Sequence, residues 1–180
     1  KNPSFWHFKG VINYKLKSFS RAIKNYKKAI SIDSTYISSI LDLAEIYFFR
    51  KNYNNSSKYL KSALLLKPEN KEIWKFFAKS LLNSGSYAFA KLAAEKACVI
   101  NPENDWESYS ILGSVLLSLS EYDNAENYLL KSIELDSSKT SPYISLSKLY
   151  SYKGDFIQSE KILRQVLNLD PLNVEAFSIL

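Results

Sequence analysis

The stretch KPEN at residues 67–70 returns as NPEN at residues 101–104 and as DPLN at residues 170–173. Pro68 and Pro102 lie 34 residues apart, and Pro171 follows after 69 more, which is two such steps and one extra residue. Recurrence at this spacing is typical of repeat arrays, in which each unit packs on the next. With these prolines at position 32, the units occupy residues 3–36, 37–70, 71–104, 106–139 and 140–173, and residues 174–180 start a sixth.

Small and aromatic residues recur at fixed positions of these units. Apolar residues between them are three and four apart, as in Ile40, Leu43 and Tyr47, which is the spacing of one helix face. Each unit is therefore predicted to form two antiparallel helices that cross at small residues, because large side chains there would hold the axes apart. Position 8 holds Gly10, Ala44, Ala78, Gly113 and Ser147; position 20 holds Ala22, Ser56, Ala90, Ala125 and Ser159; position 17 holds Phe19, Tyr53, Tyr87, Tyr122 and Phe156.

This pattern resembles the tetratricopeptide repeat (TPR) family, as the second unit shows with Leu43, Ala44, Tyr47, Tyr53, Leu60, Ala63 and Pro68. The resemblance implies an all-α fold, a right-handed solenoid of antiparallel helix pairs, with residues 1–180 forming a single array. Lys9 and Asn13 depart from the usual leucine and tyrosine, and Ser34 and Ser137 replace the proline. Because the chain contains no methionine, we expect it to be a fragment of a longer protein.

Composition limits the classes of function. Apolar residues make up 46% of the chain and charged residues 23%, which is typical of a globular protein, and no stretch approaches the roughly 18 apolar residues of a transmembrane helix. With His7 the only histidine and Cys98 the only cysteine, spacing provides no catalytic triad and no metal cluster. We therefore predict no enzyme activity, cofactor or metal. The cellular compartment stays open, because a targeting signal would be missing from such a fragment. The cytoplasm is slightly favoured.

The charge is unevenly distributed. Residues 1–100 carry 18 Lys/Arg and 6 Asp/Glu, whereas residues 101–180 carry 6 and 12. The basic run KLKSFSRAIKNYKK at residues 15–28 raises the alternative of a nucleic-acid or anionic-membrane binder. Because Arg21, Lys24 and Lys28 belong to the second helix of the unit, whose outer face is solvated in such arrays, nucleic acid is not the expected partner.

The resemblance also implies a concave groove, lined by positions 2, 5, 9, 12 and 13 of each first helix. Phe48, Phe49 and Tyr152 lie off the core stripes of their helices, which favours either apolar anchors for a ligand or packing on a neighbouring unit. Lys75 and Lys79 favour a partner that has acidic as well as apolar residues. The implied groove residues are His7, Tyr14, Leu41, Glu45, Phe48, Phe49, Lys75, Lys79, Asn83, Ser110, Ser114, Leu117, Lys148 and Tyr152.

We therefore expect a non-catalytic scaffold or adaptor that binds a peptide or protein segment in this groove. The alternative is the TPR region of a larger enzyme, for example a transferase, whose catalytic domain lies outside these residues. The carboxylate clamp for heat-shock chaperones requires lysine and asparagine where this chain has His7 and Val11, so binding of that kind is not expected. Self-association is expected through the C-terminal end, where VEAFSIL begins a helix that no further helix covers.

Overall fold

The computed structural model describes residues 2–102 and 105–180, and residues 103–104, at the end of the third predicted repeat, lie outside the described residues. Within the described ranges the regular structure is entirely helical. The predicted all-α class is therefore confirmed. The chain divides into two compact units, Lys1–Ser86, the N-terminal half, and Tyr87–Leu180, the C-terminal half.

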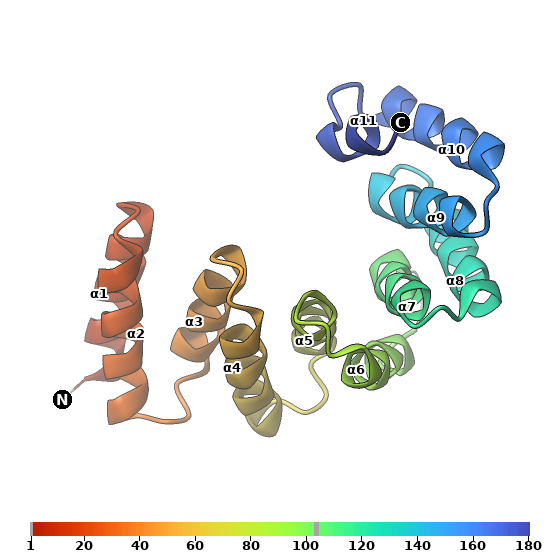
Figure 1. Cartoon of the computed structure of the whole chain (residues 1–180). Helices are drawn as coiled ribbons and strands as arrows, with labels where there is room; N and C mark the ends of the chain where they lie inside the picture. Colours follow the sequence, from red (N-terminus) through yellow and green to blue (C-terminus); the bar gives the residue numbers. More distant parts are fainter. Residues whose placement is uncertain (1, 103–104) are drawn as a thin grey trace. The chain divides into compact units, whose positions relative to one another are not determined.

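The N-terminal half contains two helix pairs and one further helix. Helix α1 packs on α2, α3 packs on α4, and α2 and α4 each contact the helix that follows them. The helices are α1 (Pro3–Lys15), α2 (Phe19–Ile32), α3 (Ile37–Phe49), α4 (Tyr53–Leu66) and α5 (Lys71–Asn83) (Figure 1).

The C-terminal half repeats this arrangement. Helix α7 packs on α8 and α9 packs on α10, while α6 lies against α7 and the short α11 contacts both α9 and α10. The helices are α6 (Tyr87–Val99), α7 (Trp106–Ser118), α8 (Tyr122–Leu135), α9 (Thr140–Tyr152), α10 (Phe156–Leu169) and α11 (Val174–Ile179). The first helices α1, α3, α5, α7 and α9 begin at the residues where the spacing of the prolines places the repeat starts.

Two of the asparagines that follow the recurring prolines, Asn70 and Asn173, are helix N-caps. The Asn70 Oδ1 atom accepts a hydrogen bond from the backbone N–H of Ile73 at 3.1 Å, and Asn173 Oδ1 accepts one from Ala176 at 3.0 Å. An N-cap side chain satisfies a backbone donor that has no partner within the helix. The proline therefore prevents one helix from continuing, and the asparagine starts the next.

The first helices end at residues with left-handed backbone geometry. The φ angle is 79° at Gly85 and 82° at Gly154, the two glycines that the sequence places at this position. At the equivalent position of other repeats, φ is 57° at Lys17 and Lys51 and 61° at Ser120. The same turn geometry therefore recurs in these repeats even where the residue is not a glycine, although a β-carbon makes this geometry less favourable.

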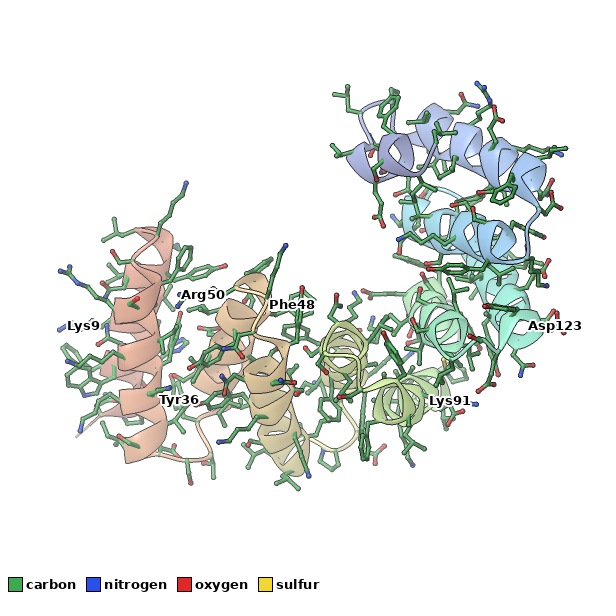
Figure 2. The ribbon with its side chains drawn as sticks, viewed as in Figure 1. Lys9, Tyr36, Phe48, Arg50, Lys91 and Asp123 are labelled. Atoms are coloured by element: carbon green, nitrogen blue, oxygen red, sulfur yellow. The ribbon has the colours of Figure 1, made fainter. Side chains whose placement is uncertain are left out.

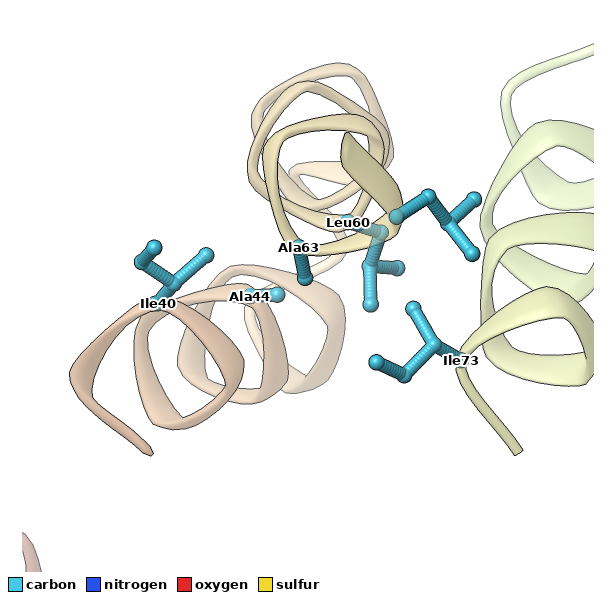
Figure 3. Close-up of a cluster of buried hydrophobic side chains, with 6 residues drawn as sticks. Ile40, Ala44, Leu60, Ala63 and Ile73 are labelled. Atoms are coloured by element: carbon cyan, nitrogen blue, oxygen red, sulfur yellow. The ribbon is translucent and has the colours of Figure 1, made fainter. Parts of the chain in front are cut away.

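The helix crossings need small side chains. A β-carbon on Gly10 would lie 2.5 Å from Cε1 of Tyr26, and one on Gly113 would lie 2.6 Å from Cγ of Leu129. In the second pair, Ala44 on α3 and Ala63 on α4 are both fully buried, within a cluster that also contains Ile40, Leu60 and Ile73 (Figure 3). These contacts bring the helix axes close together and form the core of each pair.

Candidate functional site

A groove of about 490 Å³ lies between α3 and α5 in the N-terminal half, and we call it the α3–α5 groove. It includes five of the residues that the family resemblance implied: Leu41, Glu45, Phe48, Phe49 and Lys79. The remaining lining residues are Asp42, Asn70, Glu72, Ile73 and Phe76.

Aromatic rings form much of the apolar wall of this groove. Phe48 belongs to α3 (Figure 2). Its ring centroid lies 5.2 Å from that of Phe76 and 5.2 Å from that of Tyr53. Phe48 is half-buried and therefore contributes to the packing of α3 on its neighbours. The adjacent Phe49 is 65% exposed, so its ring is available for contact with another molecule.

Two carboxylates, Asp42 and Glu45, lie one turn apart on the α3 side of the groove. The Tyr26 hydroxyl partly offsets the effect of burial on the pKa of Asp42, and the Oδ2 atom of Asp42 is 3.6 Å from Nδ1 of His7. Glu45 makes no hydrogen bond or ion pair with any residue in the described ranges. Burial raises the pKa of both carboxyl groups, and the charge of Asp42 raises the pKa of Glu45 further.

The neighbouring tyrosines respond to the same two charges. The pKa of Tyr14 is raised by burial first and then by Glu45 and Asp42, and the pKa of Tyr26 is raised by burial and then by Asp42. The N-terminal half therefore holds a partly buried, negatively charged cluster beside an apolar groove.

The basic residues of the groove differ from the expectation. Lys75 is only 7% exposed, and its Nζ atom lies 2.7 Å from Oε1 of Glu72. Its charge is therefore compensated within α5, and it is not among the residues that line the groove. The lining has three carboxylates, from Asp42, Glu45 and Glu72, and one ammonium group, from Lys79.

Comparison with known proteins addresses the family directly. A family model described as tetratricopeptide repeat matches residues 3–36, 37–70, 107–139 and 140–171. The chain belongs to the tetratricopeptide repeat family. The third predicted repeat, residues 71–104, is not among the matched ranges.

Curated relatives of this TPR chain include BBSome complex member BBS4 of Bos taurus, which is 26% identical over 137 residues, 76% of this chain and 26% of that protein. The TPR repeat-containing protein MJ1428 of Methanocaldococcus jannaschii is 25% identical over 160 residues, 85% of this chain and 27% of that protein. The chain thus spans about a quarter of the length of these relatives.

Solved structures share the TPR fold. The crystal structure of MamA has a TM-score of 0.80 at 22% identity, with 94% of this chain and 92% of MamA covered. The structure of YrrB, described as a TPR protein with an unusual peptide-binding site, has a TM-score of 0.73 at 19% identity, with 97% of this chain and 89% of YrrB covered. At these identities the likeness concerns the fold alone.

Three further residues that the TPR resemblance implied in the N-terminal half, His7, Tyr14 and Asn83, do not line the α3–α5 groove. The Nδ1 atom of His7 lies 3.2 Å from Ser39 Oγ, and the imidazole is tilted by 56° against the ring of Tyr36 at a centroid distance of 5.4 Å. Tyr14 is half-buried on α1. Asn83 donates a hydrogen bond from Nδ2 to the backbone oxygen of Lys79 at 2.8 Å, so its amide serves its own helix.

On α7 of the C-terminal half, the expectation of groove residues needs correction. Ser110 is 3% exposed and Leu117 is 8% exposed, so neither offers a surface to a ligand. The Ser114 hydroxyl lies 2.8 Å from the Ser145 hydroxyl, which joins α7 to α9. These side chains attach one first helix of the TPR array to the next.

The two residues implied on α9 have different surroundings. The Nζ atom of Lys148 lies 2.6 Å from Oε1 of Glu175 and thus connects α9 to α11. Tyr152 is 67% exposed, and its ring stacks with that of Tyr122 at a centroid distance of 6.5 Å. Of the two, only Tyr152 has a largely accessible side chain.

The sequence interpretation missed the groove residues at position 6 of the TPR repeat, Asp42 and Phe76. Positions 2, 6, 9 and 13 are three and four residues apart and share one helix face, so this spacing is a signal that could have identified them. Glu72 and Ile73, which follow the N-cap Asn70, are the other lining residues at the start of α5.

In residues 2–102 and 105–180, no group of three or more His, Cys, Asp or Glu side chains is arranged to hold a metal ion. None of the helices in these ranges has the length and apolar character needed to cross a membrane. Cys98 is half-buried on α6. The TPR fold is generally non-catalytic, and TPR repeats in general serve as protein-interaction scaffolds.

Proposed function

We propose that this chain is a non-catalytic protein-interaction module that binds a peptide or protein segment in the α3–α5 groove. An apolar side chain of the partner packs against Phe48, Phe49 and Phe76, while the rest of the segment follows the helices. The observation that carries the proposal is the 65% exposure of the Phe49 ring at a groove whose remaining aromatic wall is half-buried. Exposed aromatic rings beside a concave, partly apolar surface are typical anchors for a protein partner.

The relatives are consistent with this role. BBS4 is named as a member of a complex, and YrrB is described as having a peptide-binding site. Because the chain spans about a quarter of its curated relatives, the activity of the whole protein is a separate matter. A catalytic domain elsewhere in a longer protein would leave the proposed role of these residues unchanged.

The test is a selection of random peptides displayed on phage, with the wild-type chain and Phe49→Ser as targets. Phe89→Ser is the matched control, because Phe89 is 67% exposed on α6 and does not line the groove. We expect wild type and Phe89→Ser to enrich the same peptides and Phe49→Ser to lose them, with unchanged helix content by circular dichroism. Equal enrichment by all three proteins, or none by the wild type, would show that the groove is not a peptide site.

A second candidate role is association between copies through α11. Phe177 is 59% exposed and Leu180 is 54% exposed. Phe177 and Leu180 occupy positions 4 and 7 of the repeat. In earlier repeats the residues at position 4 (Ile40) and position 7 (Leu43 and Leu146) are buried, with exposures of 1%, 0% and 4%. We propose that the apolar face of α11 associates with a second molecule at high protein concentration.

A further inference from the structure

Two partly exposed carboxylates of the C-terminal half are each paired with a lysine, and they provide a reference for the carboxylates of the α3–α5 groove. The Oε1 atom of Glu121 lies 2.8 Å from Nζ of Lys91, and the Oε2 atom of Glu126 lies 2.8 Å from Nζ of Lys153. In each case the lysine hydrogen bond is the main reason that the pKa of the carboxyl group is lowered. These carboxylates are therefore stabilised in their charged form by a neighbouring repeat.

Asp42 and Glu45 are partly buried without such a lysine or arginine. The contacts of Asp42 are the Tyr26 hydroxyl and the His7 ring, and Glu45 has no hydrogen bond or ion pair within the described ranges. Two like charges one turn apart repel each other, and partial burial increases the cost of both. An uncompensated pair of charges at a concave surface is a feature of binding sites, because a ligand of opposite charge removes that cost.

The walls around this pair define the rest of the ligand. Leu41, Ile73 and Phe76 line the same groove as the carboxylates, so an apolar group and a cation would be bound side by side. On the α5 side, Glu72 is already paired with Lys75 at 2.7 Å, and Lys79 adds a positive charge there. The unbalanced negative charge is therefore located on α3.

We propose that the α3–α5 groove binds a protein segment in which a lysine or arginine stands beside an apolar anchor, with the cation bound between Asp42 and Glu45. This inference rests on the proposed peptide-binding function and reverses the expectation of an acidic partner, which depended on Lys75 and Lys79. A cationic side chain supplies the hydrogen-bond donors that Glu45 lacks, and its aliphatic stem packs on the apolar wall.

Other groups that face the pair influence how binding depends on pH. They are His7 and Tyr14 on α1, Tyr26 on α2, and Glu72 and Lys79 on α5. As pH falls, Asp42 and Glu45 become protonated and lose their attraction for a cation. Binding of a basic peptide should therefore weaken steadily in acid.

The experiment uses peptides from the same phage selection, synthesised with a fluorescent label, and measures their affinity by fluorescence anisotropy. We expect the enriched peptides to contain lysine or arginine next to an aromatic or aliphatic residue. Glu45→Gln should lower their affinity about tenfold, the usual effect of losing one charged hydrogen bond. Glu45 is preferred to Asp42 for this test because removing it breaks no hydrogen bond of the fold.

Two controls isolate the charge. Glu160→Gln removes a carboxylate that pairs with Arg164 on α10, at 2.6 Å, and should leave affinity unchanged. Replacing the basic residue of the peptide by glutamine should weaken binding to the wild type about tenfold and binding to Glu45→Gln hardly at all. Added salt should weaken the wild-type complex more than the Glu45→Gln complex.

The outcomes separate this inference from the proposed function. Enriched peptides that require Phe49 but are acidic or uncharged would overturn the basic-ligand inference and leave the peptide site standing. Basic peptides whose affinity is the same for Glu45→Gln as for wild type would also overturn it. Selection of no peptide that depends on Phe49 would overturn both proposals.

Discussion

The close approach of α7 and α8 at Gly113 allows a quantitative prediction. A methyl group on Gly113 would lie 2.6 Å from Cγ and 2.8 Å from Cδ2 of Leu129, and 3.2 Å from the backbone oxygen of Ala125. Overpacking of this kind costs about 1–3 kcal/mol, and contact with a branched carbon and a backbone atom places it at the upper end. Replacing glycine in a helix returns about 1 kcal/mol. We therefore expect Gly113→Ala to destabilise the pair by about 2 kcal/mol.

A second substitution tests the cause of this effect. Leu129 is fully buried, so Leu129→Ala alone should cost about 2–5 kcal/mol through the cavity that it leaves. In the double variant the methyl group at position 113 occupies part of that cavity. The loss of stability in the double variant should therefore be about 2 kcal/mol smaller than the sum of the two single losses.

The measurement must be local, because repeat arrays can unfold in parts. Native-state hydrogen exchange at the backbone amides of α7 and α8, combined with urea unfolding followed by circular dichroism, reports on this helix pair. If Gly113→Ala is neutral or stabilising, or if the two substitutions are additive, then close packing on Leu129 is not the reason for the small residue at this position.

Two further predictions concern charge and association. Because burial raises the pKa of the Glu45 carboxyl above its ordinary value of 4.5, the folded chain binds this proton more tightly than the unfolded chain, and stability falls as pH rises through that range. Glu45→Gln should therefore raise the melting temperature at neutral pH, with the gain vanishing in acid; a lower melting temperature at neutral pH would contradict this. Phe177→Ser should reduce concentration-dependent association in sedimentation equilibrium, whereas a wild type that is monomeric at every concentration would rule out the α11 contact.

The repeat architecture could be predicted from the sequence because each local constraint recurs along the chain. A crossing such as that of Gly10 with Tyr26 tolerates only a small residue, and the same requirement returns at Gly113. The proline and asparagine pattern that ends one helix and caps the next also acts within a few residues. Constraints of this kind recur at a fixed period along the chain, so they can be recognised from the sequence alone.

The chemistry of the groove was decided only by the tertiary structure. Lys75 and Lys79 lie one turn apart and are indistinguishable by periodicity, yet Lys75 is 7% exposed and paired with Glu72 whereas Lys79 lines the groove. Likewise, nothing in the spacing shows that Glu126 meets Lys153 from the next repeat while Glu45 meets no cation within the described ranges. Burial and charge compensation depend on atoms brought together from different helices, and a pattern within one helix cannot determine them.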